Sequence, residues 1–470
     1  MIGRNAARPN VLGVAITAAL LASCGGQSSA PQLPTTSGAQ ASLSQPTSTA
    51  RSDHAPRYSI QDLGTLGGTF SQAGGLNNRG SVAGFSTRAG DMTVHAFLWQ
   101  DARLTDLGTG GQPNSFTSED YPINDRDDVT GYLDTSTPDP NGEDYCLVGD
   151  HHICLPFVWR KGAITTLPLP GGNNGQALQI NNRGQIVGQG ETGVIDPKCQ
   201  APQVYDYVAT VWGPGKGQLQ KLPPYGNDTQ AVAFGINGRG EIVGSSGKCQ
   251  LQSKSLGFIE AILWRNGKPI NLGNLGGRIF NTAFSINNKS EITGQASLRG
   301  SSHGFHFHAY LWRRGAMADL GTLPGDVISL GNGINDSTQI AGLSFPPGSG
   351  TAHGFLWQNG VMYDMNSIIP KHSPIIVLEA LGINNRGQIA GYGFDRNTSN
   401  VHGYIATPCD AANHDLKGCR DTRGTSTPPD FVLPPKARAL LERMNRRRFG
   451  VWPGSNVSSH QQVQKRSVVP

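Results

Sequence analysis

The side chains of this 470-residue sequence that could bind a metal ion or move a proton lie in a few short stretches. His151 and His152 are adjacent, and His303 and His306 lie in a stretch rich in glycine and serine. Imidazoles are common metal ligands and acid–base groups. Residues three apart on a strand face opposite sides, so His303 and His306 would not share an ion without a bend. We expect these four histidines to contact a ligand rather than a metal.

Oxygen-bearing side chains are also grouped near the first histidine pair. Asp139, Asn141, Glu143 and Asp150 resemble the ligands of a calcium loop, but Asp144 stands where that loop requires glycine. The sequence contains no HExxH or P-loop motif. We therefore expect no metal, no cofactor and no catalytic residue within a linear motif. Paired carboxylates brought together from distant segments stay open, because such pairs leave no linear pattern.

The N-terminal residues indicate export. Arg4 and Arg8 precede an apolar run from Val11 to Ala22, which is too short to span a bilayer but fits the core of a secretory signal. Leu21-Ala22-Ser23-Cys24 resembles the bacterial lipobox, in which the signal is removed before a lipid-modified cysteine. We expect a signal peptide over residues 1–23, lipidation of Cys24 and an outer-membrane lipoprotein on the periplasmic or cell-surface side. The alternative is an ordinary secreted protein.

Export would leave six cysteines, an even number in an oxidising compartment. Six cysteines allow 15 connectivities, so spacing alone does not fix the pairs. Metal ligation is the competing use, but the sequence has no CxxC. The connectivity stays open, but position suggests three candidate pairs that could close one loop, join two neighbouring repeats and hold the C-terminal tail: Cys146 with Cys154, Cys199 with Cys249, and Cys409 with Cys419.

A repeat of roughly 50 residues organises most of the chain, as in propellers and linear arrays. The segment ALGINNRGQIAG (Ala380 to Gly391) has seven versions. An asparagine that opens a tight turn usually bonds its own backbone, and we prefer this role to a ligand site made of seven amides. The first asparagine of the segment falls at Asn77, Asn124, Asn181, Asn237, Asn287, Asn335 and Asn384.

Each repeat can be divided into four short strands joined by tight turns. The third strand ends in tryptophan in six repeats, and Ala406 takes this position in the seventh. We expect these positions to be buried between neighbouring sheets, since a four-stranded sheet cannot bury its faces alone. The six tryptophans are Trp99, Trp159, Trp212, Trp264, Trp312 and Trp357.

The two ends of the repeat region complement each other. The chain enters at Tyr58 with a fourth strand only, and it leaves through His402 to Pro408 with a third strand only. Pairing of the two would remove the open edges of a linear array. The sequence therefore predicts an all-β fold, a seven-bladed β-propeller of four-stranded blades over residues 57–409, closed by the N-terminal strand.

The repeats resemble the HAF extracellular repeats, a family named for the motif present here as HAFLW (His95 to Trp99). The family pattern continues with Asp-Leu-Gly-Thr-Leu-Gly-Gly, matched at Asp62 to Gly68, and then with the asparagine segment. Repeats two to four depart from it, with Leu155, Val208 and Glu260 in place of the histidine. The resemblance implies an exported repeat protein and no particular chemistry. We expect the histidines that are kept to form hydrogen bonds at the strand start: His95, His308, His353 and His402.

Residues 24–56 and 410–470 flank the repeats and differ from them in composition. The first segment is rich in Ser, Thr and Pro and is expected to be a flexible linker. The second holds 11 Lys and Arg and 5 Asp and Glu, which accounts for the formal charge of +5, and it is expected to be a partly disordered tail with a short helix. The nearly neutral repeats show no nucleic-acid footprint, and the lipid is the only membrane attachment we expect.

Strand direction suggests where a ligand would bind. If the strands alternate, the connections between second and third strands all lie on one face, and the large insertions fall there. We expect a monomeric binding module that takes a glycan or a protein on this face. The alternative is a polysaccharide hydrolase or lyase with a site in the central channel. The candidate ligand-face residues are Tyr132, Tyr145, His151, His152, Tyr205, Tyr207, His303 and His306.

Overall fold

The computed structural model describes residues 55–118, 121–146, 148–199, 203–215, 217–249, 258–278, 280–300, 306–347, 351–410, 418–420, 424–425, 433–435 and 437–438. The chain divides into two units, Met1–Ala41 and Ser42–Pro470, and every element below belongs to the second. The predicted signal peptide, Cys24, His303 and most of the linker and tail lie outside the described residues. No helix in the described part of the chain is long and apolar enough to cross a membrane.

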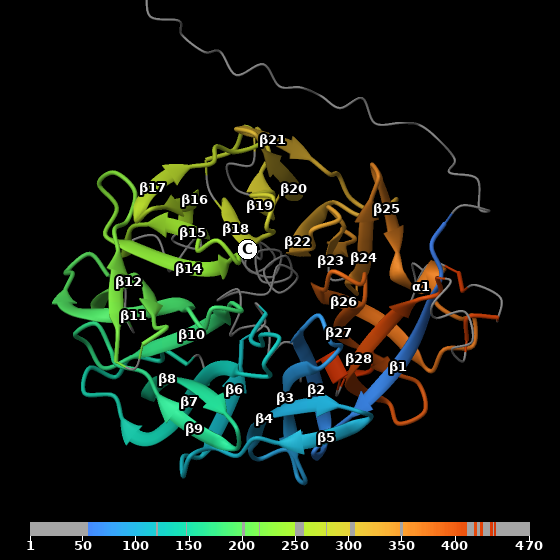
Figure 1. Ribbon diagram of the computed structural model, residues 1–470, viewed down its shortest axis with the longest axis horizontal. Coiled ribbons are helices and arrows are strands. Elements are labelled where there is room, and N and C mark those ends of the chain that lie inside the picture. Colours follow the sequence, from blue (N-terminus) through green and yellow to red (C-terminus); the bar gives the residue numbers. More distant parts are fainter. Residues whose placement is uncertain are drawn as a thin grey trace, which may run out of the picture. The chain divides into compact units, whose positions relative to one another are not determined.

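The described residues form an all-β fold of short strands (Figure 1). We number the repeats by their strands. Repeat 1 contains β2 (Gly67–Leu76), β3 (Val82–Arg88), β4 (Val94–Gln100) and β5 (Arg103–Asp106). Repeat 2 contains β6 (Asn114–Thr117), β7 (Val129–Pro138), β8 (His152–Arg160) and β9 (Ala163–Thr166). Repeat 3 contains β10 (Gly175–Ile180), β11 (Ile186–Ile195), β12 (Tyr205–Trp212) and β13 (Leu219–Leu222).

The remaining repeats follow the same plan. Repeat 4 contains β14 (Gln230–Ile236), β15 (Ile242–Gly247), β16 (Phe258–Arg265) and β17 (Lys268–Asn271). Repeat 5 contains β18 (Thr282–Ile286), β19 (Ile292–Ser297), β20 (Phe307–Arg313) and β21 (Ala316–Asp319). Repeat 6 contains β22 (Ile328–Ile334), β23 (Ile340–Phe345), β24 (His353–Gln358) and β25 (Val361–Asp364). Repeat 7 contains β26 (Ile375–Ile383), β27 (Ile389–Asp395), β28 (Asn400–Pro408) and the N-terminal β1 (Tyr58–Gly64), and the short helix α1 (Met365–Ile368) precedes it.

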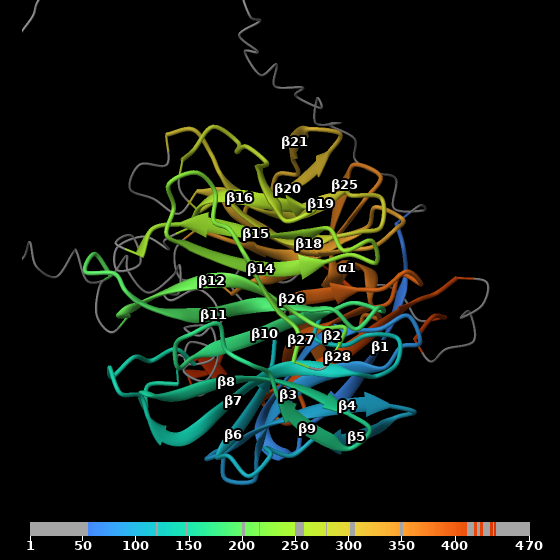
Figure 2. The same cartoon turned by 60° about the vertical axis from the view of Figure 1, so that its left-hand side comes forward.

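Repeats 2 to 6 are separate four-stranded sheets in which each strand pairs with the next along the chain. All of these pairs are antiparallel, as the tight turns predict, and Figure 2 shows the sheets in succession. Repeats 1 and 7 share one eight-stranded sheet, joined by a parallel bridge between Phe70 and Val401.

The N-terminal strand β1 completes repeat 7. It pairs antiparallel with β28, and Asp62 lies opposite Tyr404 in the same register in which Asp319 lies opposite Tyr310 within repeat 5. A strand from the start of the chain therefore pairs with β28 where the fourth strand pairs with the third in the other repeats.

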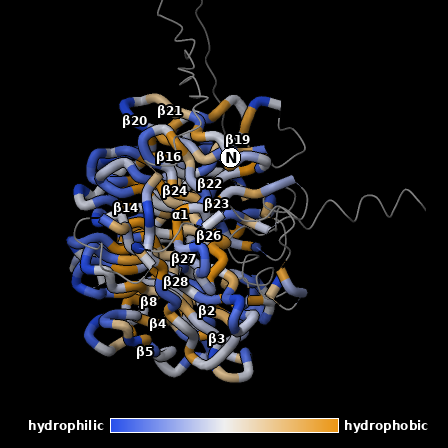
Figure 3. The backbone as a smooth tube through the Cα atoms, turned by 90° about the vertical axis from the view of Figure 1, so that its right-hand side faces the viewer, coloured by the Kyte–Doolittle hydropathy of each residue, from blue (hydrophilic) through white to orange (hydrophobic). Residues whose placement is uncertain are grey.

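Apolar side chains fill the contacts between consecutive repeats. In the described residues seven such clusters join 1 to 2, 2 to 3 and so on, and one of them joins repeat 7 to repeat 1. Each cluster contains one residue from the predicted tryptophan position, with Ala406 in the cluster between repeats 6 and 7. Apolar positions gather in the interior of the body in Figure 3. The predicted place between sheets is confirmed for all seven positions; five of them are buried, and Trp159 and Trp357 are partly buried.

The repeated asparagine shapes the turn between the first and second strands. In all seven repeats its Oδ1 accepts hydrogen bonds from the backbone N–H groups two and four residues later, as Asn384 does from Arg386 and Gln388 at 3.0 Å each. The third residue after the asparagine has a positive φ in every copy, from 59° at Ser290 to 92° at Gly80. The predicted turn role is confirmed, and it uses only one of the two amide atoms.

The other amide atom links the repeats to one another. Each Nδ2 donates to the backbone carbonyl of the corresponding asparagine in the next repeat, over distances from 2.9 to 3.3 Å. The last of these bonds runs from Asn384 to Asn77 at 2.9 Å, so the series returns to its start. Buried amides and carbonyls are costly to leave unpaired, and one side chain here satisfies a turn and a neighbour together.

Candidate functional site: paired carboxyl groups on the loop face

The loop face consists of the connections between second and third strands, which lie opposite the asparagine turns. In four repeats this face carries the histidine that opens the third strand, and each histidine contacts an aspartate; His402 also lies 3.9 Å from a second one, Asp395. The Nδ1 atoms of His95, His308 and His402 lie 2.9 Å from oxygens of Asp106, Asp319 and Asp62, respectively. His353 Nδ1 lies 3.0 Å from Asp326, which raises the pKa of His353 although burial opposes the shift. The predicted hydrogen-bonding role is confirmed.

Repeats 2 to 4 lack this histidine and carry pairs of carboxyl groups instead. Glu260 occupies the histidine position of repeat 4 and lies beside Asp228, which precedes β14 by the same spacing as Asp326 precedes β22. Burial and the charge of Asp228 raise the pKa of Glu260 to about 7. The carboxyl pair of Glu260 and Asp228 in repeat 4 therefore stands where repeat 6 has the ion pair of His353 and Asp326.

The most deeply buried pair joins the two largest insertions. Glu143, in the β7–β8 connection, and Glu191, on β11, are both 0% exposed. Burial, followed by the charge of Glu143, raises the pKa of Glu191 to about 8. At neutral pH the pair holds a proton, because two adjacent buried carboxylates do not both ionise.

Backbone and amide donors hold this pair in place. Oε2 of Glu191 accepts from the N–H groups of Asn173 and Asn174, while Oε1 of Glu143 accepts from the N–H of Tyr205 at 2.9 Å. The Nε2 of Gln203 reaches both carboxyl groups at 3.2 Å. The pair thus ties the β7–β8 connection to the β11–β12 connection, and its full burial leaves it closed to a substrate.

A third pair includes an imidazole. Asp134 on β7, Asp150 and His152 each place one ligand atom so that all three atoms lie within 4.8 Å of one another. His152 Nδ1 lies 3.2 Å from Asp150 Oδ2. Asp134 is 0% exposed, and burial together with Asp150 raises its pKa to about 6. Of the four oxygen-bearing residues that resemble a calcium loop in the sequence, only Asp150 belongs to this group.

The other residues of that resemblance have different partners. Oδ1 of Asp139 accepts from the backbone N–H groups of Asn141 and Glu143, at 2.8 and 3.0 Å, and so closes a turn. Glu143 belongs to the buried pair. These residues therefore do not converge on one centre.

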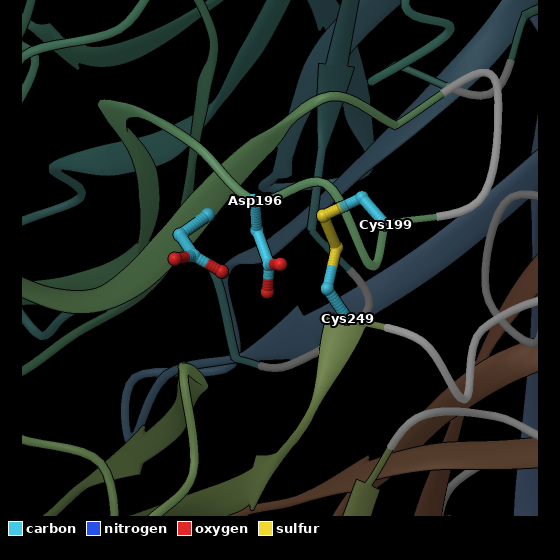
Figure 4. A group of neighbouring side chains, drawn as sticks. Asp196, Cys199 and Cys249 are labelled. Atoms are coloured by element: carbon cyan, nitrogen blue, oxygen red, sulfur yellow. A yellow bond between two sulfur atoms is a disulfide. The ribbon is translucent and has the colours of Figure 1, made fainter.

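A fourth pair lies beside a disulfide. Asp196 and Asp206 approach the bridge between Cys199 and Cys249, and burial followed by the charge of Asp196 raises the pKa of Asp206. Figure 4 shows the two sulfur atoms bonded to each other next to the carboxylate of Asp196. Because both thiols are used in the bridge, neither can serve as a thiolate metal ligand.

The three candidate disulfides are all present. Cys146–Cys154 closes the β7–β8 connection, Cys199–Cys249 joins repeats 3 and 4, and Cys409–Cys419 holds the start of the tail. Two of the three bridges lie on the loop face, where the connections are longest. Disulfides in long connections restrict the unfolded chain and hold the loops in one arrangement.

Three of the predicted ligand-face tyrosines are not available on the surface. Tyr132, Tyr145 and Tyr207 are 9%, 7% and 5% exposed and belong to one aromatic cluster. Their apolar rings pack beneath the insertions instead of facing solvent, so this part of the prediction is wrong. Tyr205 and His152 are half-buried, while His151 and His306 are exposed.

The inner strands leave little room along their common centre. The hydroxyl of Tyr121, from repeat 2, accepts from the N–H of Ile383 at 2.7 Å and lies 3.1 Å from its carbonyl, in repeat 7. The ring also lies against Gly333 of repeat 6, where an added Cβ would stand 2.0 Å from the hydroxyl oxygen. Glycines therefore let one tyrosine fill the space between inner strands. The sequence analysis missed Tyr121, which follows no repeat pattern.

Part of the C-terminal tail packs into the same interior. Leu433 and Ala437 are 8% and 4% exposed and join the aromatic cluster that contains Phe70 of β2 and Phe116 of β6. The backbone N–H of Gly424 donates to the carbonyl of Ile369, next to α1, at 2.8 Å. These tail residues are part of the folded body, whereas the composition suggested a solvated segment.

Comparisons with known proteins give structural matches only. No family model and no curated protein sequence matches the chain. The β-propeller domain of the Trilobed protease from Pyrococcus furiosus overlaps 75% of this chain and 95% of its own, with 9% identity and a TM-score of 0.43. Pyrococcus horikoshii acylaminoacyl peptidase overlaps 73% of this chain and 53% of its own, with 9% identity and a TM-score of 0.41. The gluconolactonase XC5397 from Xanthomonas campestris overlaps 75% and 91%, with 10% identity and a TM-score of 0.33. Matches at these scores support no functional argument.

Proposed function

We propose that this chain is a seven-bladed β-propeller, closed by β1 as the fourth strand of the last blade. Three observations support the proposal: the pairing of β1 with β28, the apolar cluster between repeats 7 and 1, and the bond from Asn384 to Asn77. Each of the three joins the end of the repeat region to its beginning. A ring of this kind has no free strand edge to pair with another chain.

The propeller acts as an exported binding module at the cell envelope, anchored by a lipid on Cys24, and takes a glycan or a protein on its loop face. One observation carries this proposal: the two insertions at residues 132–154 and 189–207, two of the three disulfides and the carboxyl pairs lie in repeats 2 to 4 on that face. Residues 132–154 and 189–207 together hold eight Asp and Glu and one Lys, in a chain of net charge +5. A rigid scaffold with acidic loops suits a ligand rich in hydroxyl or cationic groups.

An enzyme acting on polysaccharide in the central channel is less well supported. Tyr121 and the glycines around it occupy the space between inner strands, and the buried pair of Glu143 and Glu191 is fully covered. Catalytic carboxyl groups must reach the bond that they act on. A channel-centred site would require both obstacles to move.

The ligand face can be tested with the oxidised full chain on glycan arrays and in pull-downs from envelope extracts. Ile195→Ser and His151→Ala alter exposed residues of the β11–β12 and β7–β8 connections, and Ile195 is 65% exposed. Met92→Ser is the matched control, since Met92 is 85% exposed on the same face in repeat 1, which has no large insertion. We expect capture to fall at least tenfold in the first two variants and to stay unchanged in the control. Equal capture by all four proteins would contradict the proposal.

A further inference from the structure

We infer that Asp134, Asp150 and His152 form a binding site for one divalent transition-metal ion of the Zn²⁺ class. The site lies on the loop face of repeat 2, and its function as a metal site does not depend on the identity of any glycan or protein ligand. The argument rests on the convergence of three ligand atoms and on one buried oxygen that lacks a partner.

The strand pair β7–β8 brings the ligands together. Asp134 lies opposite Cys154 in the ladder, and His152 precedes Cys154 by two residues. The side chains of Asp134 and His152 therefore point to the same face of the sheet. The register shifts between Asp134 and Pro138, so the regular ladder ends beside the aspartate. Cys154 is bonded to Cys146, and the bridge fixes the connection that carries Asp150.

The decisive observation is the state of Asp134. Its Oδ2 accepts a hydrogen bond from Asn114 Nδ2 at 2.8 Å, which orients the carboxyl group. Its Oδ1 is buried and receives no hydrogen bond from a donor group, and Asp134 places one carboxylate oxygen within 4.8 Å of a ligand atom of Asp150 and of one of His152. A buried carboxylate oxygen without a partner is costly, and a bound cation would supply the missing interaction.

The surroundings favour a cation. No Lys or Arg occurs between residues 132 and 154, whereas five Asp and Glu do. The side chains of Asp150 and His152 are 34% and 29% exposed, so an ion can enter from solvent and keep water as a further ligand. Asn114 holds the carboxyl group of Asp134 by a hydrogen bond, as outer hydrogen-bond partners orient the ligands of known metal sites.

The ligand set selects the class of ion. One imidazole and two carboxylates with an open position suit Zn²⁺, which accepts nitrogen and oxygen ligands in a tetrahedral arrangement. Calcium prefers six to eight oxygen ligands, and three side chains of which one is an imidazole do not provide them.

The test uses the oxidised full chain, stripped with EDTA and dialysed against Zn²⁺ at pH 7.5, with bound metal measured by mass spectrometry and affinity by calorimetry. We expect one Zn²⁺ per chain at this site, an at least tenfold weaker affinity in Asp134→Asn and in His152→Gln, and no displacement by an equal concentration of Ca²⁺. Asp319→Asn is the matched control. It removes the carboxylate beside His308 on the same face, and that pair contains no second carboxylate. We expect this control to bind Zn²⁺ as the unaltered chain does.

A thermal unfolding series separates metal binding from folding. Without metal, Asp134→Asn should unfold at the same or a higher temperature than the unaltered chain, since it removes a buried charge. Added Zn²⁺ should raise the midpoint of the unaltered chain and of Asp319→Asn, but not that of Asp134→Asn. The inference is overturned if Zn²⁺ binds equally to all variants, if none binds to the unaltered chain, or if Ca²⁺ binds more tightly and does so without His152.

Discussion

His402 on β28 and Asp62 on β1 are 340 residues apart in the sequence, and their Nδ1 and Oδ2 atoms lie 2.9 Å apart. The contact repeats the one that His95 makes with Asp106 and His308 with Asp319 inside single repeats. The first strand of the domain thus carries the aspartate that the last repeat lacks. This match of side chains, together with the strand pairing, identifies β1 as the missing fourth strand.

Asp62→Asn should weaken the attachment of β1. Burial opposes the shift, but the hydrogen bond from His402, followed by that from the Gly64 N–H, lowers the pKa of Asp62 below 3.8. A lowered carboxyl pKa stabilises the fold above the unfolded value, and the contribution is lost as the pH falls through the folded value. Because Asp62 is one-third exposed, we expect a loss of only about 0.5–1 kcal/mol at pH 6, measured by urea unfolding. Asp106→Asn should lose a similar amount of stability. If Asp106→Asn is destabilised and Asp62→Asn is not, the assignment of β1 as the fourth strand is contradicted.

Asn384→Asp should destabilise the closure while leaving its turn intact. The aspartate keeps an oxygen for the N–H groups of Arg386 and Gln388 but loses the Nδ2 that donates to Asn77. The lost donor and the added buried charge should cost about 2–4 kcal/mol in urea unfolding. Asn385→Asp, at the neighbouring exposed position, serves as the control and should cost less than half as much. Equal losses would show that the bond between repeats contributes nothing specific.

Gly333→Ala should be strongly destabilising, and Tyr121→Phe should relieve part of the loss. The added Cβ would lie 2.0 Å from the Tyr121 hydroxyl and 2.8 Å from the ring carbon that carries it, so removing the oxygen removes the closest clash. Alone, Tyr121→Phe should cost about 1–2 kcal/mol, because the N–H of Ile383 loses its acceptor. A double-mutant cycle by urea unfolding measures the coupling, which should be favourable by at least about 1 kcal/mol. If the stability losses of Gly333→Ala and Tyr121→Phe simply add in the double variant, the contact between Gly333 and the Tyr121 hydroxyl is excluded.

The pair of Glu143 and Glu191 predicts a fold that loses stability as the pH rises. The pKa of Glu191 is about 8, against 4.5 in the unfolded chain. Between these values the unfolded chain has released a proton that the folded chain retains, so the free energy of unfolding decreases with pH. Glu191→Gln should remove this slope and be more stable than the unaltered chain at pH 8 by about 1–3 kcal/mol. Urea midpoints from pH 5 to pH 8.5 provide the measurement, and parallel profiles for the two proteins would refute the prediction.

Glu260→His should convert the acid pair of repeat 4 into the ion pair of repeat 6. His353 and Asp326 show that an imidazole at this place can meet an aspartate at 3.0 Å. Asp228 would then face a partner instead of a second carboxyl group, and the variant should gain about 0.5–1 kcal/mol at pH 7. Glu260→Gln, which removes the repulsion without adding a cation, provides the comparison. A Glu260→His protein no more stable than Glu260→Gln would rule out the ion pair.

The sequence predicted the elements that repeat and missed those that occur once. Strand order, turns, the tryptophan positions and the disulfide pairs follow from patterns that recur or from simple proximity. Glu143 with Glu191 and Asp134 with Asp150 have no recurring pattern, because each partner comes from a different segment and only folding makes them adjacent. The excess of acidic residues in the two insertions was the available signal. Three tyrosines were assigned to the surface, but Tyr132 and Tyr207 lie on strands β7 and β12, and Tyr145 packs against Tyr207.

The series of asparagine bonds has a consequence for how such chains evolve. Every copy is at once a donor to the next repeat and an acceptor from the previous one, with the same atoms and no special first or last member. Gain or loss of one copy by gene duplication or deletion would therefore leave each remaining asparagine with a partner of the same kind. The number of copies must then be set by how the sheets pack, and not by the polar contacts at their inner turns.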